Sequence, residues 1–204
     1  MSKKYILAVE TITNSGSLSL FSEQTGEIDC YVGNKNNKMS MDIFNMIRDL
    51  TVRNSIEMNQ ISKIIVLNGP GNFTGLRIGF SVGKGLAKAL GVPFLTIPIL
   101  DMLLLHLQTT GLKCAFTSVG GGKTTYKFSA GKELVNVSTT TFTSDILTKE
   151  EIKFITIKET FESMFPQASI LKFNNISVPT VSISTLMAQH FPRIINTNMQ
   201  IIYT

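Results

Sequence analysis

The sequence contains 204 residues, of which 43% are hydrophobic and only 16% are charged, and its formal net charge is +5. This length and composition favour a folded protein with a sizeable core in one domain or two small lobes. No apolar run approaches the roughly 20 residues of a membrane-spanning helix, and the apolar run 5–9 is too short for a signal peptide, so we expect a soluble cytoplasmic protein.

The low charge content also bears on partners. With so few charged residues, the chain is expected to cover part of its apolar surface with another protein rather than with water. Its lysines are scattered and no basic run is interleaved with aromatic residues, which favours a solvated basic surface over a groove for RNA. Cys30 and Cys114 lack the spacing of metal ligands, so we expect two buried free thiols.

The first part of the chain predicts strands followed by a helix. Short apolar segments separated by turn residues predict an antiparallel meander with strands at 5–10, 17–21 and 27–32. A helix is expected over 39–53, because apolar residues recur on one face at helical spacing. That stripe consists of Met39, Ile43, Met46, Ile47 and Leu50. Since Met41, Phe44 and Val52 lie away from the stripe, we expect this helix to bury a second side against a partner.

The most informative segment is the joint at residues 68–77. A buried strand at 63–67 is followed by Gly69, Pro70 and Gly71, which force a turn, and then by a helix over about 75–90. One face of this helix carries small residues at four-residue spacing, namely Gly75, Gly79, Gly83 and Ala87. Because glycine costs about 1 kcal/mol per helical position relative to alanine, we interpret this ridge as a surface for close approach of a neighbouring protein. A well-formed strand-to-helix joint is the alternative interpretation of the turn itself.

The rest of the chain predicts a smaller second lobe. A strand at 94–97 and an apolar helix at 99–107 precede a shift in composition at 109–111. Beyond it we expect strands at 113–117, 124–129, 133–137, 151–157 and 169–173, and a helix at 184–191. We therefore predict an α/β protein with an N-terminal lobe at 1–108 and a C-terminal lobe at 109–204.

Two groups of residues resemble the TsaB (YeaZ) family. The opening Ile6–Thr13, followed by Ser-Leu-Ser-Leu at 17–20, is similar to the start of that family. Gly-Pro-Gly-Asn-Phe-Thr-Gly-Leu-Arg-Ile-Gly at 69–79 resembles the family's hallmark almost residue for residue, and 84–87 and 91–93 continue it. The resemblance is specific over residues 5–102 and loose beyond Gly111.

The resemblance implies an actin-like, two-lobe fold of the ASKHA ATPase type. It implies a non-catalytic platform in the bacterial synthesis of threonylcarbamoyladenosine in tRNA. Such a platform pairs through N-lobe helices with TsaD, the catalytic subunit; TsaE, an ATPase, joins the assembly, and tRNA is reached indirectly. Family members also form homodimers. No cofactor, metal or membrane is expected, and ATP or ADP would bind only at an interface with a partner.

On this basis partner binding is assigned to the two helices. The assigned residues are Met39, Ile43, Met46, Ile47, Leu50, Gly75, Arg77, Gly79 and Gly83. Arg77 offers a guanidinium group for an anion or a partner carboxylate. We expect replacement of Gly79 by leucine to break pairing and to leave the lobe folded.

The sequence departs from the family pattern in three places. The first strand ends in Glu10 where the family usually has Asp, and Met39-Ser40 stands where a histidine-serine pair is common. In the second lobe, residues 117–121 replace an Asp-Ala-Arg-like segment. These losses argue against chemistry at those positions.

The main alternative is an actin-like nucleotide-binding enzyme that uses Glu10 and the hairpin 11–16. Its possible contacts to a nucleotide or anion are Glu10, Thr11, Thr13, Gly69 and Gly71. A single carboxylate gives little support for Mg²⁺ binding, and the Gly-Gly-Gly-Lys-Thr run at 120–124 lacks the spacing of a phosphate-binding loop. Direct tRNA binding by the scattered lysines is a third class, and no protease motif is present.

Overall fold

The chain forms two compact units. The first contains Met1–Asn68, Phe73–Ile97 and Val181–Thr204, and the second contains Gly69–Asn72 and Pro98–Thr180. This computed structural model describes residues 4–13, 15–26, 28–33, 39–107, 109, 111–120, 123–130, 133–137, 152–157, 160, 176–177, 179 and 182–195.

The first unit is built on a mixed five-stranded sheet in the order β3-β2-β1-β4-β5. Its strands are β1 (Tyr5–Glu10), β2 (Ser17–Ser22), β3 (Ile28–Val32), β4 (Ile61–Leu67) and β5 (Phe94–Ile97). Strands β1, β2 and β3 pair antiparallel, whereas β4 pairs parallel to β1, and β5 parallel to β4. Because parallel neighbours need crossover connections, helices follow β3 and β4.

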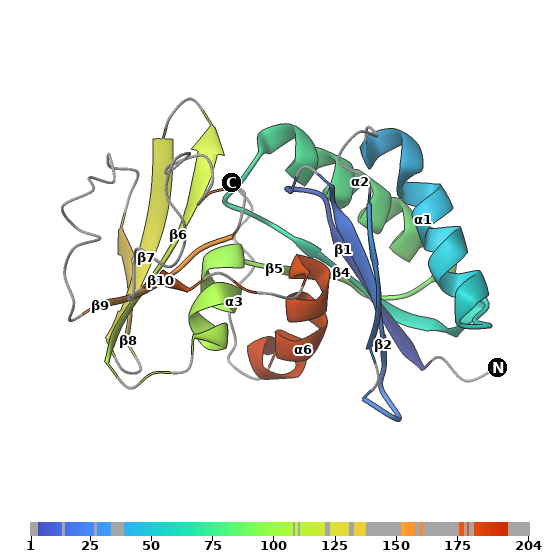
Figure 1. Ribbon diagram of the computed structural model, residues 1–204. Coiled ribbons are helices and arrows are strands. Elements are labelled where there is room, and N and C mark those ends of the chain that lie inside the picture. Colours follow the sequence, from blue (N-terminus) through green and yellow to red (C-terminus); the bar gives the residue numbers. More distant parts are fainter. Residues whose placement is uncertain are drawn as a thin grey trace. The chain divides into compact units, whose positions relative to one another are not determined.

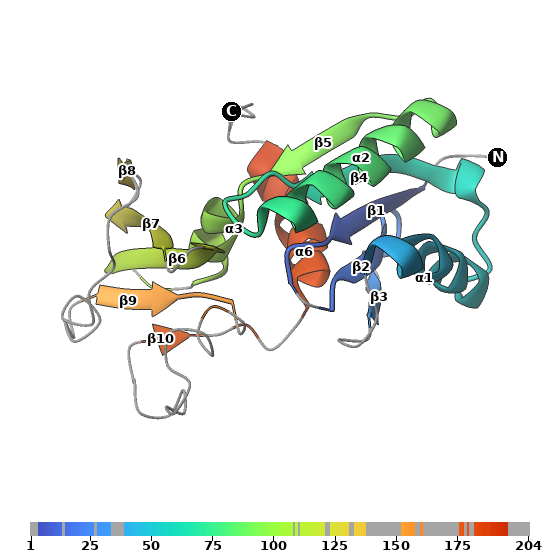
Figure 2. The same cartoon turned by 90° about the horizontal axis from the view of Figure 1, so that it is seen from above.

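Helices cover both faces of this sheet (Figure 1; Figure 2). One face is covered by helix α1 (Met39–Arg53) and helix α2 (Phe73–Leu90). A short 3₁₀ helix, η1 (Met58–Gln60), follows α1 in the chain. Helix α6 (Ile183–Ile195) lies on the other face. The core between the sheet and the first two helices contains alternate strand residues and one face of α1. Its members include Leu7, Val9, Leu18, Leu20, Ile64 and Val66, with Ile43, Met46, Ile47 and Leu50.

The second unit repeats the strand topology of the first. Its sheet has the order β10-β9-β6-β7-β8, with β6 (Leu112–Gly120), β7 (Lys123–Ala130), β8 (Glu133–Val137), β9 (Ile152–Ile155) and β10 (Ile176–Ser177). Again three antiparallel strands are followed by two parallel ones. Helix α3 (Ile99–His106) belongs to this unit, and a buried ion pair joins its Asp101 to Lys127 of β7.

The predicted elements agree closely with those observed. Strands at 5–10, 94–97 and 133–137 and the helix at 39–53 have the predicted bounds, and α2 begins two residues earlier than expected. The predicted strand at 169–173 lies outside the described residues. Gly91 ends α2 as expected, with a positive φ of 60° and bonds from its own N–H and that of Val92 back to the last turn.

The lobe boundary differs from the prediction of 108/109. Residues 98–107, predicted in the first lobe, belong to the second unit. Helix α6, predicted in the second lobe, belongs to the first unit. Helix α6 buries Ile183, Leu186 and Met187, and its Ser184 Oγ lies 2.8 Å from Ser19 Oγ of β2. The sequence pattern identified this helix and gave no sign of the sheet that it covers.

Candidate functional site

The loop between β1 and β2 is organised by Glu10, the last residue of β1. Its side chain is only 1% exposed. Oε1 accepts hydrogen bonds from the amides of Ile12 (2.6 Å) and Thr13 (2.7 Å). Oε2 accepts from Thr13 Oγ1 (2.8 Å) and Ser17 Oγ (2.9 Å). Burial raises the pKa of Glu10, against the lowering effect of these hydrogen bonds.

Thr11 fastens this loop to the start of α2. Its Oγ1 donates a hydrogen bond to the carbonyl oxygen of Gly75 at 2.6 Å. A Cβ added at Gly75 or Gly79 would come within 3.0 Å of Thr11, which is closer than real Cβ atoms approach. At Gly83 an added Cβ would lie 2.6 Å from Val66 Cγ1. The glycines therefore let α2 lie directly on its own sheet and loop.

This packing corrects the role assigned to Gly75, Gly79 and Gly83. All three are buried inside the first unit, so the ridge receives Thr11 and Val66 and not a neighbouring protein. The expectation for Gly79→Leu also changes, because a leucine there would collide with Thr11 and disturb the lobe itself.

Helix α1 has a buried face and an exposed apolar face. Ile43, Met46, Ile47 and Leu50, assigned above to partner binding, lie in the unit's own core; the Met39 side chain lies outside the described part. Phe44 is 59% exposed and Val52 is 71% exposed. These two residues and the exposed Arg48 follow one another at four-residue spacing, so they share one side of the helix.

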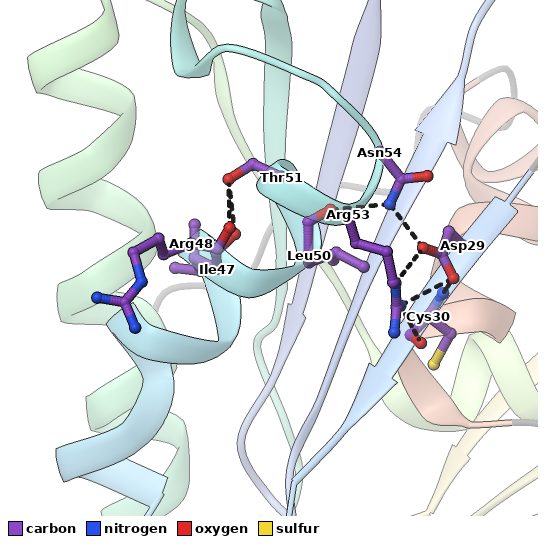
Figure 3. Close-up of polar contacts among 8 residues, drawn as sticks. All are labelled: Asp29, Cys30, Ile47, Arg48, Leu50, Thr51, Arg53 and Asn54. Atoms are coloured by element: carbon purple, nitrogen blue, oxygen red, sulfur yellow. Dashed lines mark hydrogen bonds and ion pairs between the residues drawn. The ribbon is translucent and has the colours of Figure 1, made fainter.

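A polar clamp holds the C-terminal end of α1 on the edge strand β3 (Figure 3). Arg53 donates from Nε and Nη2 to the two carboxylate oxygens of Asp29, each at 2.9 Å, and from Nη2 to the carbonyl of Cys30. Asn54 Nδ2 donates to Asp29 (2.6 Å) and to the carbonyl of Leu50 (2.8 Å). The clamp fixes the direction in which α1 presents its outer side.

Helix α2 adds exposed aromatic and basic groups on the same side of the sheet. Phe73 is 69% exposed, and the guanidinium of Arg77 lies 5.4 Å from its ring centroid. Lys84 lies over Phe80 in the same way, at 5.7 Å. Arg77, Lys84 and Lys88 are all exposed, so the outer face of α2 is positively charged.

The predicted anion contacts fall in two places. Glu10, Thr11 and Thr13 lie in the first unit, whereas Gly69 and Gly71 belong to the second. Gly69 has a positive φ of 97°, as its place in the turn predicted, and its carbonyl accepts a hydrogen bond from the amide of Ile99.

The remaining predicted features are reported for the described residues only. Cys30 and Cys114 are free; Cys30 is half-buried, and burial raises the pKa of the Cys114 thiol to about 12. Within that part of the chain, no three His, Cys, Asp or Glu side chains gather as metal ligands would. The helices seen there lack the combined length and apolar character that a bilayer crossing requires.

Comparison with known families identifies the chain. A family model described as TsaD, tRNA N6-adenosine threonylcarbamoyltransferase, matches residues 36–190. The chain belongs to this family. The curated relatives it matches are TsaB proteins, which confirms the resemblance to the TsaB (YeaZ) family.

Two of these relatives are described as tRNA threonylcarbamoyladenosine biosynthesis protein TsaB. The one from Escherichia coli is 27% identical over 95 residues, which is 47% of this chain and 40% of the relative. The one from Bacillus subtilis is 31% identical over 101 residues, 48% of this chain and 42% of the relative. The chain thus spans about two fifths of the length of the TsaB proteins it matches.

Solved structures extend the likeness over the whole fold. A Pseudomonas aeruginosa protein described as similar to peptidase YeaZ has a TM-score of 0.70 and 17% identity, covering 98% of this chain and 95% of that one. YeaZ from Pseudomonas aeruginosa has a TM-score of 0.65 and 18% identity, with 100% of both chains covered. The chain therefore has the α/β fold of these YeaZ structures, with the two mixed five-stranded sheets described above.

Proposed function

We propose that this chain is a non-catalytic subunit in the biosynthesis of threonylcarbamoyladenosine in tRNA, where it binds and orders a TsaD-like catalytic subunit. The names of its TsaB relatives support the pathway. The observation that carries the role is the outer side of α1, where Phe44 and Val52 are exposed on a helix whose other side already fills the core.

Phe44 and Val52 are suited to anchor a partner. Burying apolar surface is favourable by about 25 cal/mol per Å², and aromatic anchors contribute a large share of interface energy. The Asp29–Arg53 clamp adds preorganisation, because a helix already held in place loses less freedom on binding. The proposed partner surface is therefore no longer the buried stripe of α1 or the glycines of α2. It is formed by the exposed residues on the outer side of α1.

The charges on α2 point to an acidic face on the partner. Arg77, Lys84 and Lys88 are exposed along this helix, and complementary charge speeds association and fixes orientation. Among the assigned residues, Arg77 keeps its place in the proposed interface. In the isolated chain, a homodimer would use the same outer side of α1.

The remaining partners follow from the same proposal. A TsaE-like ATPase would join the assembly, tRNA would be contacted through the complex, and ATP or ADP would bind only where this chain meets a partner. The assembly would work in the cytoplasm.

The nucleotide-hydrolysing alternative has less support. Both carboxylate oxygens of Glu10 already accept hydrogen bonds from its own loop, and the Thr11 hydroxyl is engaged by Gly75. These groups would have to be released before they could contact a magnesium ion or phosphate.

Reconstitution tests the proposal. The TsaD-like subunit of the same organism is supplied with tRNA and threonylcarbamoyl-adenylate, with and without this chain, and the modified nucleoside is measured by mass spectrometry. We expect formation to depend on the chain and the chain alone to form none. Equal activity of the TsaD-like subunit without it, or transfer by the chain alone, would contradict the proposal.

A further inference from the structure

The β1–β2 loop directs backbone amides at a single point. The N–H groups of Ile12 and Thr13, consecutive in the chain, both donate to Oε1 of Glu10 at 2.6 and 2.7 Å. Successive amides that converge in this way form a concave anion-binding nest. Here the group inside the nest is the chain's own carboxylate.

Two hydroxyl groups extend the same pattern. Thr13 Oγ1 accepts from the amide of Gly16 (3.1 Å) and lies 2.8 Å from Glu10 Oε2. Ser17 Oγ accepts from the amide of Ser184 (3.2 Å) and lies 2.9 Å from Oε2. Because each hydroxyl already accepts a backbone N–H, its own proton is directed at the carboxylate. Two amides and two hydroxyl groups therefore donate to the Glu10 carboxylate.

One further hydrogen bond links this cradle to a distant part of the chain. Ser184 is the second residue of α6, and it lies 167 positions from Ser17 in the sequence. Its amide is one of the first N–H groups of α6, which lack a partner within the helix. This amide donates to Ser17 Oγ, and Ser17 Oγ donates to the carboxylate. The Ser17 hydroxyl thus connects Glu10 to the start of α6.

We propose that Glu10 is the resident anion of this cradle, occupying the place that an external anion would take. By occupying these donors it keeps phosphate groups from binding to the loop, and it holds the Ser17 hydroxyl that accepts the amide of Ser184 at the start of α6. The inference concerns the isolated chain and does not depend on the proposed partner.

Chemical rescue tests the inference. Glu10→Ala removes the group whose shape matches acetate and leaves the donors unpaired. Thermal unfolding is followed in sodium acetate and in sodium chloride at equal ionic strength. We expect acetate to raise the melting temperature of the Ala variant several degrees more than chloride does, because a ligand bound only by the folded state stabilises it. Wild type and the matched control Glu23→Ala, which removes a surface carboxylate, should respond alike to both salts.

Two outcomes would overturn the inference. One is an Ala variant that responds to acetate no differently from wild type. The other is calorimetric binding of MgATP to wild type that is lost in Glu10→Gln. If the Ala variant does not fold, Glu10→Gln is used with amide hydrogen exchange. Faster exchange at Ile12, Thr13 and Ser184 is expected, and unchanged exchange at all three would contradict the cradle.

Discussion

At the scale of single residues, Thr11 explains the glycines of α2. Its carbonyl and hydroxyl oxygens take the space where side chains at Gly75 and Gly79 would lie. A spacing of four residues identifies a smooth helix face but carries no information about what lies against it. For this reason the sequence predicted the ridge correctly and assigned it to a partner wrongly.

Two alanine substitutions in the same helix should have opposite effects. Gly75→Ala should destabilise the chain by about 3 kcal/mol, since backbone atoms of Thr11 cannot easily move away. Gly85→Ala should stabilise it by up to about 1 kcal/mol, because an added Cβ meets no atom within 4 Å in the described part of the chain. Urea unfolding measures both; equal stabilities of the two variants would contradict the packing described.

The Asp29 carboxyl provides a test by pH. Burial raises the pKa of Asp29, but the hydrogen bonds from Asn54, Arg53 and the Cys30 amide outweigh it, so the pKa lies below the ordinary 3.8. Its contribution to stability is therefore present above pH 3.8 and is lost as the pH falls through the folded-state pKa. Because the pair is exposed, that contribution is small.

An NMR titration of the Asp29 side-chain carboxyl carbon measures this shift. In Arg53→Met the pKa of Asp29 should rise toward its ordinary value, while Arg48→Met, which removes another exposed arginine of the same helix, should leave it unchanged. A pKa of Asp29 that is the same in wild type and Arg53→Met would show that the clamp is absent in solution.

At the scale of elements, α1 shows how far the sequence could be interpreted. Its bounds were predicted to the residue, because the 3.6-residue period and the flanking polar loops are local features. The same period gives two faces and does not say which one packs on the chain's own sheet. The donors to Glu10 lie within seven positions of it in the sequence, but no pattern of residue types shows that they converge on its side chain. The bond from the Ser184 amide to Ser17, 167 positions away, is a contact that no local pattern reports.

The end of α1 yields a third prediction. Ser55 has a positive φ of 54°, and the amides of Ser55 and Ile56 bond back to the carbonyls of Val52 and Thr51, as in a Schellman cap. Because this conformation is strained for residues other than glycine, Ser55→Gly should stabilise the chain by up to about 1 kcal/mol. Thermal and urea unfolding measure the change, and a destabilised variant would contradict the cap.

At the scale of the whole molecule, the chain repeats one strand topology in two units while the two halves show no visible sequence repeat. The topology follows from an antiparallel meander and parallel crossovers, and many apolar sequences satisfy that pattern. Because many functions share one fold, the surface of the chain bears more directly on its function than the topology does. In the first unit the distinguishing surface is the outer side of α1, next to the basic face of α2.

The affinity of this chain for the TsaD-like subunit, measured by calorimetry, tests the account most directly. Phe44→Asp is compared with Val32→Asp, a matched control on β3 with 57% exposure against 59% for Phe44. We predict that Phe44→Asp raises the Kd at least about tenfold, a loss of about 1.4 kcal/mol. Val32→Asp should leave the Kd unchanged, and both variants should remain folded. Wild-type affinity in a folded Phe44→Asp chain would contradict the proposed interface.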